Sequence, residues 1–122
     1  MILAETSVWV DHFRGANVGL SEILADGSVL VHPFIIGELA CGNLKNRKLI
    51  LADLHALPFA TSATGEEVLL LIDKSKLWGR GIGWADAHLL ASALLSNCTL
   101  WTLDKQLQSS AKAAAVKLYT RE

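Results

Sequence analysis

The order of hydrophobic and polar residues predicts short strands that alternate with amphipathic helices. Segment 84–96 gives the clearest helical pattern, because Leu90, Ala93 and Leu94 follow Asp86 at the spacing of one helix face. Strands are expected at the short apolar runs 1–4, 28–31, 57–59, 99–102 and 116–119. Helices are expected between them, at residues 6–13, 20–25, 33–42, 45–55, 64–78, 84–96 and 105–113.

Capping and turn residues mark several of these boundaries. Thr6 or Ser7 is placed to cap the first helix, and Pro33 suits the first turn of a later one. Turns or loops are expected at residues 15–19, 26–27 and 79–83, where Gly, Asn and Asp gather.

Strands that alternate with helices form βαβ units. The predicted fold class is therefore α/β, a single domain over residues 1–122 with a parallel β-sheet flanked by helices on both faces. In such sheets, ligands bind beyond the carboxyl ends of the strands. Acidic residues at those ends and on the following helices are the first candidates for chemistry.

Composition narrows the class of protein. More than half of the 122 residues are hydrophobic, which fits one compact core, yet no unbroken apolar run reaches the roughly 20 residues that span a bilayer. The N-terminus lacks the basic lead-in of a signal peptide. We therefore expect a cytoplasmic protein with no membrane segment, and Cys41 and Cys98 as reduced thiols in its core.

Four acidic residues stand out by position. Glu5 ends the first strand, Glu38 interrupts an apolar helix, Asp86 opens the clearest helix, and Asp104 follows the strand at 99–102. Three of them have ordinary structural interpretations when taken singly. Glu5 suits an ion pair at a strand end, Asp86 the positive end of a helix, and Asp104 an N-cap.

Glu38 is the hardest of the four to explain as structural, because its neighbours in sequence are Ile, Leu and Cys. A carboxylate buried among them is costly unless it pairs with a cation such as Arg14 or binds a metal ion. Several carboxylates that converge at one sheet edge repel one another, and a hard divalent cation relieves that repulsion. Such a site activates water and stabilises the charge of a phosphodiester under attack.

Four segments occur in an order and spacing that match a known family: MILAETSVWVDHFRG, VHPFIIGELACG, GRGIGWADAHLLASALL and TLWTLDKQL. They resemble the VapC-type toxins of the PIN-domain family, in which the first strand ends in Asp-Thr-Ser and runs into a helix. The resemblance covers essentially the whole chain. Each motif is modestly specific alone, whereas four in order form a strong signal.

The resemblance implies a metal-dependent endoribonuclease toxin that hydrolyses RNA phosphodiesters, with tRNA or ribosomal RNA as the expected substrate. It also implies a small VapB-type antitoxin that neutralises the toxin, and a homodimer. The implied cofactor is Mg²⁺ or Mn²⁺. The implied catalytic and metal-binding residues are Glu5, Glu38, Asp86 and Asp104, with Thr6 and Thr102 ordering the site.

One residue departs from the family pattern, since the first acid is normally Asp and is Glu5 here. Glu remains a hard oxygen ligand, but its longer side chain moves the carboxylate, and metal sites are sensitive to such shifts. The alternative function is therefore a catalytically attenuated PIN module that binds antitoxin or RNA without efficient cleavage. A phosphoacceptor receiver domain, which also binds Mg²⁺ in an α/β fold, is disfavoured because no acidic pair lies near Glu5.

The formal net charge of −1 means that RNA must be met by a local basic patch. Arg14, Arg80 and Lys105 are candidates, and Arg80 is favoured because it lies in the glycine loop before Asp86. The cluster Lys45, Arg47 and Lys48 suits phosphate contacts and an ordinary solvated helix equally. The four tryptophans are expected mostly in the core or in subunit contacts, and the four histidines have no metal-binding spacing.

Overall fold

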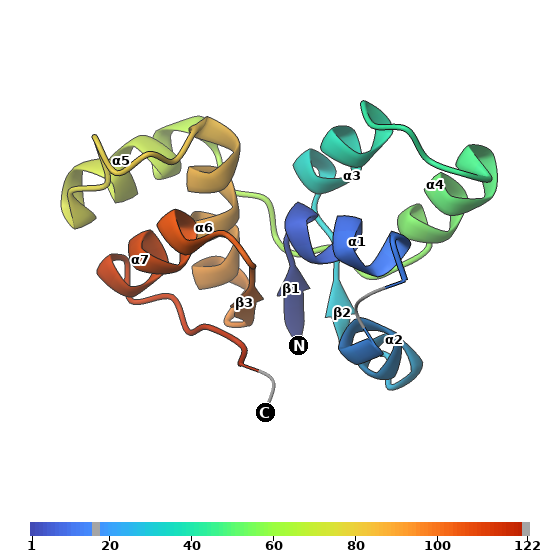
Figure 1. Cartoon of the computed structure of the whole chain (residues 1–122). Coiled ribbons are helices and arrows are strands. Elements are labelled where there is room, and N and C mark those ends of the chain that lie inside the picture. The colour runs from blue at the N-terminus through green and yellow to red at the C-terminus, as the bar shows by residue number, and fades with distance from the viewer. Residues whose placement is uncertain (16–17, 121–122) are drawn as a thin grey trace.

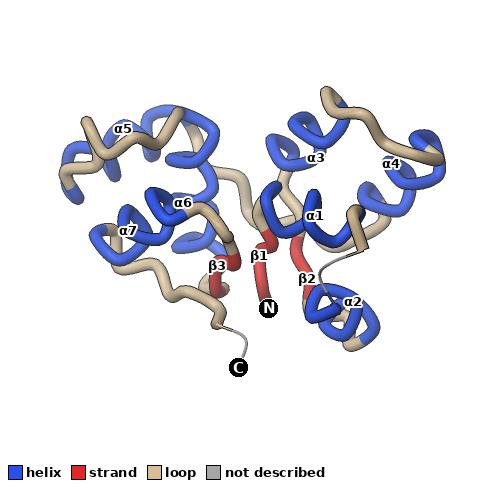
Figure 2. Tube along the Cα trace, viewed as in Figure 1, coloured by secondary structure: helices blue, strands red, loops and turns tan. Residues whose placement is uncertain are grey.

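The computed structural model describes residues 1–15 and 18–120. In this part of the chain, parallel strands form a small central sheet of order β2-β1-β3. Helices lie on both sides of the sheet (Figures 1 and 2), which confirms the α/β prediction. The strands are β1 (Ile2–Ala4), β2 (Val29–Leu30) and β3 (Thr99–Trp101). The helices are α1 (Thr6–Phe13), α2 (Val18–Ala25), α3 (Pro33–Ala40), α4 (Arg47–His55), α5 (Gly65–Ser75), α6 (Trp84–Ser96) and α7 (Lys105–Ala113).

The central strand β1 sets the position of the other two strands. Leu3 pairs with Leu30 on one side and with Leu100 on the other, both in parallel register. The carboxyl ends of the three strands therefore meet at one edge of the sheet, where the helices α1, α3 and α7 begin. This edge is the place where the sequence predicts a ligand site.

The helices form two groups on either side of the strands (Figure 1). Helices α5, α6 and α7 lie on the left in this view and α1 to α4 on the right. Helix α6 packs on β3 and on α5, whereas α1 packs on α2 and α3. The edge of the sheet thus receives side chains from both groups. No helix in the described part of the chain is long and apolar enough to cross a membrane.

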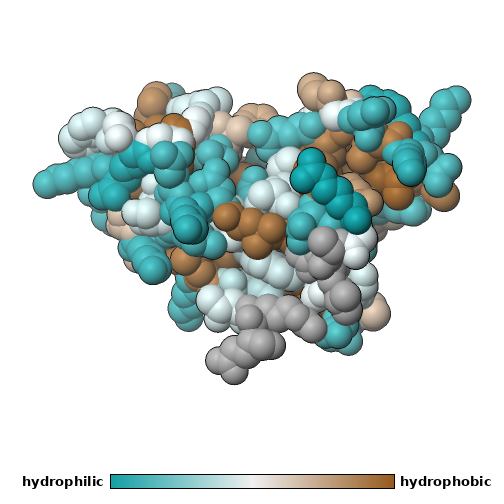
Figure 3. Space-filling view, in the orientation of Figure 1, coloured by the Kyte–Doolittle hydropathy of each residue, from teal (hydrophilic) through white to brown (hydrophobic). Residues whose placement is uncertain are grey.

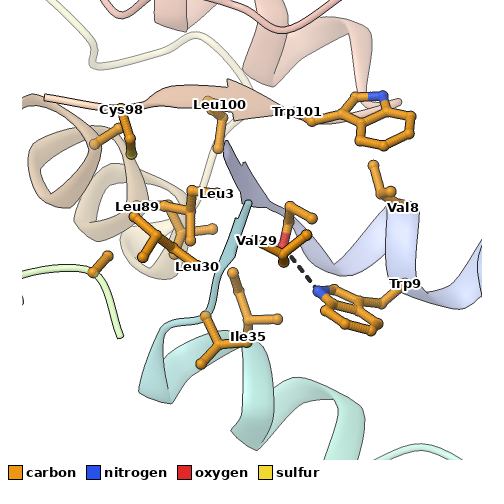
Figure 4. Packing of buried hydrophobic residues seen from close by; sticks show 14 of the residues in the cluster. Leu3, Val8, Trp9, Val29, Leu30, Ile35, Leu89, Cys98, Leu100 and Trp101 are labelled. Atoms are coloured by element: carbon orange, nitrogen blue, oxygen red, sulfur yellow. Dashed lines mark hydrogen bonds between the residues drawn. The ribbon is translucent and has the colours of Figure 1, made fainter. Parts of the chain in front are cut away.

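The core is built from the strands and from the helix faces turned toward them (Figure 4). Leu3, Leu89 and Leu100 are fully buried there. The buried Trp9 donates a hydrogen bond from Nε1 to the backbone oxygen of Ala4 at 3.1 Å, so its polar atom has a partner. Because Ala4 immediately precedes Glu5, this bond fixes the end of β1 against α1.

Two of the five expected strands, 57–59 and 116–119, are wrong. Each makes only one isolated parallel bridge, beside β2 and β3 respectively. Pro58 lacks the amide hydrogen needed to extend the first of these ladders. The helices predicted at 84–96 and 105–113 have the predicted boundaries. In both segments the capping or turn residues and the hydrophobic periodicity indicate the same ends. Residues 16 and 17 of the turn predicted at 15–19 lie outside the described residues.

Two local expectations need correction. The N-cap of α1 is Glu5, not Thr6 or Ser7, because the Glu5 carboxylate reaches the amide of Ser7. Cys98 is buried as expected, but Cys41 is exposed at the end of α3, where the helix face turns to solvent. Both thiols are free.

His32 joins β2 to α3 and is buried in its neutral form. Its Nδ1 accepts a hydrogen bond from the amide of Phe34 at 3.0 Å, which caps α3. Burial, and to a lesser degree the nearby His88, lower the pKa of His32 to about 4. Its Nε2 has no hydrogen-bond partner among the described residues. Protonation would place a charge in the core beside the cap, so folding favours the neutral ring.

We expect the variant His32→Asn to reduce the loss of stability at acidic pH. The pKa of His32 falls from 6.5 unfolded to about 4 folded, so its contribution is complete above pH 6.5 and is lost toward pH 4. The loss amounts to about 2 kcal/mol between pH 7.5 and 5. Asn keeps a capping oxygen and does not titrate. Urea unfolding at both pH values measures the difference.

The matched control for this prediction is His55→Asn, since His55 is an exposed histidine on α4. It should keep the pH dependence of the wild-type protein. An unchanged pH dependence in His32→Asn would show that protonation of His32 does not destabilise the fold.

Candidate active site

Glu5 is a buried carboxylate at the carboxyl end of the central strand. Its side chain is 7% exposed. The oxygen Oε1 accepts hydrogen bonds from the Ser7 amide at 3.1 Å, the Ser7 hydroxyl at 2.5 Å and the Thr102 hydroxyl at 2.7 Å. Three donors on one oxygen offset the cost of burying the charge. No described residue donates a hydrogen bond to the second oxygen, Oε2, which leaves it available to a cation.

Ser7 and Thr102 tie the segments that follow β1 and β3 to each other. The Ser7 hydroxyl accepts a hydrogen bond from the Leu103 amide at 2.9 Å. The Thr102 hydroxyl accepts one from the Asp104 amide at 3.1 Å, and both hydroxyls donate to Glu5. Sequence reasoning considered Ser7 only as a helix cap and missed this role. The available signal was a Ser two residues after a strand-end acid.

Asp104 lies at the end of the neighbouring strand and caps α7. Its Oδ1 accepts hydrogen bonds from the amides of Gln106 at 2.8 Å and Leu107 at 3.1 Å. The ordinary interpretation of Asp104 as an N-cap is therefore correct. These bonds also hold its carboxylate in one orientation at the sheet edge. Both bonds engage Oδ1, so Oδ2 is the oxygen left for another ligand.

Glu38 corrects the expectation of a carboxylate buried in an apolar helix. It is exposed, because Ile35, Ile36 and Leu39 occupy the buried face of α3 while residue 38 lies on the opposite side. Its hydrogen-bond partner is Thr6, whose hydroxyl donates to Oε1 at 2.6 Å, rather than Arg14. This bond joins the first turn of α1 to the last turn of α3.

Asp86 connects the four acids electrostatically. It lies in the first turn of α6 and accepts a long hydrogen bond, 3.5 Å, from the Gly83 amide. Burial raises the pKa of Asp86, and the negative charges of Glu5, Glu38 and Asp104 raise it further, against the opposing Gly83 bond. Carboxylates influence one another in this way only at short range. The structure therefore brings Asp86 within the field of the other three predicted acids.

The chemistry of these donors fits a hard divalent cation, although they do not form a closed cage. Among residues 1–15 and 18–120, no group of three or more His, Cys, Asp or Glu side chains is close enough to hold a metal ion as it stands. Mg²⁺ is typically held by one or two carboxylates and keeps several waters. An open set of oxygen ligands is compatible with that kind of binding.

A groove of about 600 Å³ opens beside Glu38, between α1, α3 and α4. Thr6 and Glu38 line one part of it, and five apolar side chains line much of the rest. Apolar surface is visible among α3 and α4 on the right of Figure 3. The apolar lining residues are Val10, Phe13, Leu39, Leu44 and Ile50, and the cations Arg14 and Lys45 also contribute.

The cations expected to contact RNA lie at different places around the acids. Arg14 lines the groove, and Lys105 is an exposed residue next to Asp104 at the start of α7. Arg80 is exposed, but its Nε donates to the backbone oxygen of Lys76 at 3.0 Å, which turns the side chain toward the end of α5.

The sequence matches the family model of the PIN domain over residues 2–113. It is 43% identical to Ribonuclease VapC32 from two strains of Mycobacterium tuberculosis, CDC 1551 / Oshkosh and ATCC 25618 / H37Rv. Each alignment covers 97% of this chain and 96% of the relative. The chain therefore matches both proteins over nearly their full length.

Solved structures share the fold at lower sequence identity. FitAB bound to an IR36 DNA fragment has a TM-score of 0.67 at 18% identity, covering 98% of this chain and 94% of that chain. FitAcB from Neisseria gonorrhoeae has a TM-score of 0.67 at 19% identity, covering 98% and 97%. PAE2754 from Pyrobaculum aerophilum has a TM-score of 0.62 at 16% identity, covering 92% and 80%. From its sequence and its fold together, the chain belongs to the PIN-domain family and is of the VapC type.

Proposed function

We propose that this protein is an endoribonuclease toxin that hydrolyses RNA phosphodiesters at the carboxyl edge of its sheet. The observation that carries the proposal is the shared electrostatic field of Glu5, Glu38, Asp86 and Asp104. A set of carboxylates that raises the pKa of one member is poised to bind a cation rather than an anionic substrate alone. The relative at 43% identity, which is named a ribonuclease, supports RNA as the substrate.

The four acids would hold Mg²⁺ or Mn²⁺, with Glu5 and Asp104 offering the oxygens that their hydrogen bonds leave free. Bound there, the metal supplies a more acidic water and offsets charge on the phosphate. Water, and not the ribose 2′-hydroxyl, then forms the new bond to phosphorus while the bond to the 3′-oxygen breaks. The products would carry 5′-phosphate and 3′-hydroxyl ends.

Thr6, Ser7 and Thr102 act on the acids and not on the substrate. Thr6 orients Glu38, whereas Ser7 and Thr102 fix one oxygen of Glu5. The alternative of a catalytically attenuated module rested on Glu in place of Asp at position 5. No finding favours that alternative, and the bonds to Oε1 show the longer side chain held firmly in place.

A small VapB-type antitoxin is the partner proposed for the groove beside Glu38. Its apolar lining suits the apolar face of a helix or an extended segment, and Glu38 in its wall suits an inserted Arg or Lys. A protein bound in this way covers Thr6 and Glu38, and so blocks access to the acids. Neutralisation would then follow from occupation of the site.

We expect wild-type protein to cut a mixture of tRNA and ribosomal RNA with Mn²⁺, and Asp86→Asn to lower the rate at least about 100-fold. Asn keeps the size of the side chain but removes a charged oxygen ligand from the site. The products are separated on denaturing gels and their ends are tested with a 5′-phosphate-dependent exonuclease. EDTA should abolish cutting by the wild-type protein.

Glu66→Gln is the matched control for Asp86→Asn, because Glu66 is also a first-turn acid but lies exposed on α5. It should cut like the wild-type protein. Cutting that persists in EDTA, or in Asp86→Asn at the wild-type rate, would refute a metal-dependent site at these acids.

We expect Leu44→Asp to escape neutralisation, because a charge in the apolar part of the groove disfavours the partner. The measurement is growth of cells that express the variant with and without a cognate VapB-type antitoxin. The variant should arrest growth in both cases, and its toxicity shows that it folds. Leu70→Asp, at an exposed leucine of α5, is the control that should be neutralised. Equal neutralisation of both variants would exclude the groove as the antitoxin site.

A further inference from the structure

A row of four rings runs between α6 and α3, the helices that carry Asp86 and Glu38. The rings of Trp84 and His88 meet edge to face with centroids 4.7 Å apart. The His88 ring lies 4.7 Å from that of Phe34, and Phe34 lies 5.2 Å from His32. The row is therefore continuous from one group of helices to the other.

The two ends of this row differ in exposure. His32 is buried at 2% exposure, whereas Trp84 is 47% exposed. Tryptophans were expected mostly in the core or in subunit contacts; Trp9 and Trp101 lie in the core, whereas Trp84 and Trp78 are exposed. Exposure of an indole ring leaves a large apolar surface in contact with water, which is unfavourable. An indole in such a position therefore calls for an explanation.

The row joins helix segments that also carry two of the predicted acids, although Trp84 and Asp86, two residues apart on α6, project from different sides of that helix. Trp84 is the first residue of α6, and Asp86 is the third. At the other helix, Phe34 lies one turn before Glu38, so both project from the same side of α3. The row therefore joins the two helices that carry Asp86 and Glu38, and Trp84 is its exposed member, whereas Phe34 is half-buried.

Trp84 is held in place rather than free to rotate. His88, one turn later on α6, packs edge to face against its ring. On α5, the position that a Cβ of Gly65 would occupy lies 3.7 Å from Cζ2 of Trp84, so the ring also lies against that helix end. An aromatic surface fixed in advance loses little conformational entropy when a flat ligand stacks on it.

The loop before Trp84 is packed against the helix of Asp104. Gly81 has a φ of +79°, and a Cβ at this residue would lie 2.7 Å from Nε2 of Gln106 on α7. The left-handed backbone at this residue favours glycine. The loop before Trp84 thus packs against the first turn of α7, which Asp104 caps.

The negative charge of the acids disfavours contacts with RNA phosphates. Affinity for RNA at this site must therefore come partly from contacts with the bases. Four carboxylates repel the RNA backbone, and the formal net charge of the chain is −1. Stacking of a base on an aromatic ring contributes about 1–3 kcal/mol and does not require opposite charge. It also tolerates every base, because each has a π face.

We propose that Trp84 is the base-stacking residue of this site and holds an unpaired nucleobase of single-stranded RNA next to the acids. The inference rests on the proposed nuclease function and adds a substrate-binding residue to it. The stacked base positions the neighbouring phosphate near Asp86. His88 and Gly65 support the ring and do not touch the RNA.

The test measures RNA binding in the Asp86→Asn background, which is expected not to cut. The probes are fluorescein-labelled hexaadenylate and a hexamer of abasic ribose phosphates, and binding is followed by fluorescence anisotropy. Trp84→Ala should weaken hexaadenylate binding about 5- to 150-fold, from the stacking energy above, and leave the abasic strand unchanged. Trp84→Phe should retain most of the affinity, whereas Trp84→Leu should not, because leucine has no π face.

Trp78→Ala is the matched control, since Trp78 is 63% exposed in the same stretch of chain but eight residues from Asp86. It should bind hexaadenylate within twofold of the background protein. A loss in Trp84→Ala that is equal for both strands would assign Trp84 a structural role and overturn the proposal. Hexaadenylate binding by Trp84→Leu that equals binding by the background protein would overturn the proposal too.

Cleavage by the wild-type protein is measured separately, so the two proposals can fail independently. Base-dependent binding through Trp84 without any cutting would refute the nuclease and keep the stacking role. Cutting with unchanged hexaadenylate binding in Trp84→Ala would keep the nuclease and refute the stacking role. Unchanged RNA binding with lost antitoxin neutralisation would assign the ring to a protein partner, which also overturns the proposal.

Discussion

The hydrogen bonds to one oxygen of Glu5 are the interaction on which the site depends. A charged carboxylate that is 7% exposed would destabilise the fold by several kcal/mol if it had no donors. Ser7 and Thr102 provide them from segments that follow two different strands. The same bonds therefore stabilise the charge, fix the end of β1 relative to β3, and leave the second oxygen of Glu5 free.

Only Asp104 among the remaining acids also follows a strand, whereas Glu38 and Asp86 lie on helices α3 and α6. Asp104 follows β3 and is oriented by capping α7, while Glu38 is oriented by Thr6. Asp86 lies in the first turn of α6. Burial raises its pKa, and the negative charges of the other three acids raise it further. Repulsion among the carboxylates opposes a closed ligand cage in the free protein, so an open arrangement is what electrostatics favours. A divalent cation would draw the same oxygens together.

Sequence patterns predicted the elements with strong local signals and failed where contacts are non-local. The helices beginning at Trp84 and Lys105 were placed correctly from periodicity and from the Asp104 cap. The strand expected at 116–119 failed because pairing depends on a distant neighbour. Glu38 was expected to be buried, since the sequence of an apolar helix does not show how wide its buried face is. Convergence of the acids and the homodimer were expected from the family resemblance, and the cytoplasmic location from the composition; the homodimer and the location stay predictions.

The central claim is that the acids at the carboxyl edge of the sheet hold the catalytic metal. Anomalous X-ray diffraction from crystals grown with Mn²⁺ tests it most directly. The account predicts an anomalous peak coordinated by carboxylate oxygens of this set, with Asp86 among the ligands, and its loss in Asp86→Asn crystals. Crystals saturated with Mn²⁺ that show no peak at this edge, or a peak held by other residues, would contradict the account.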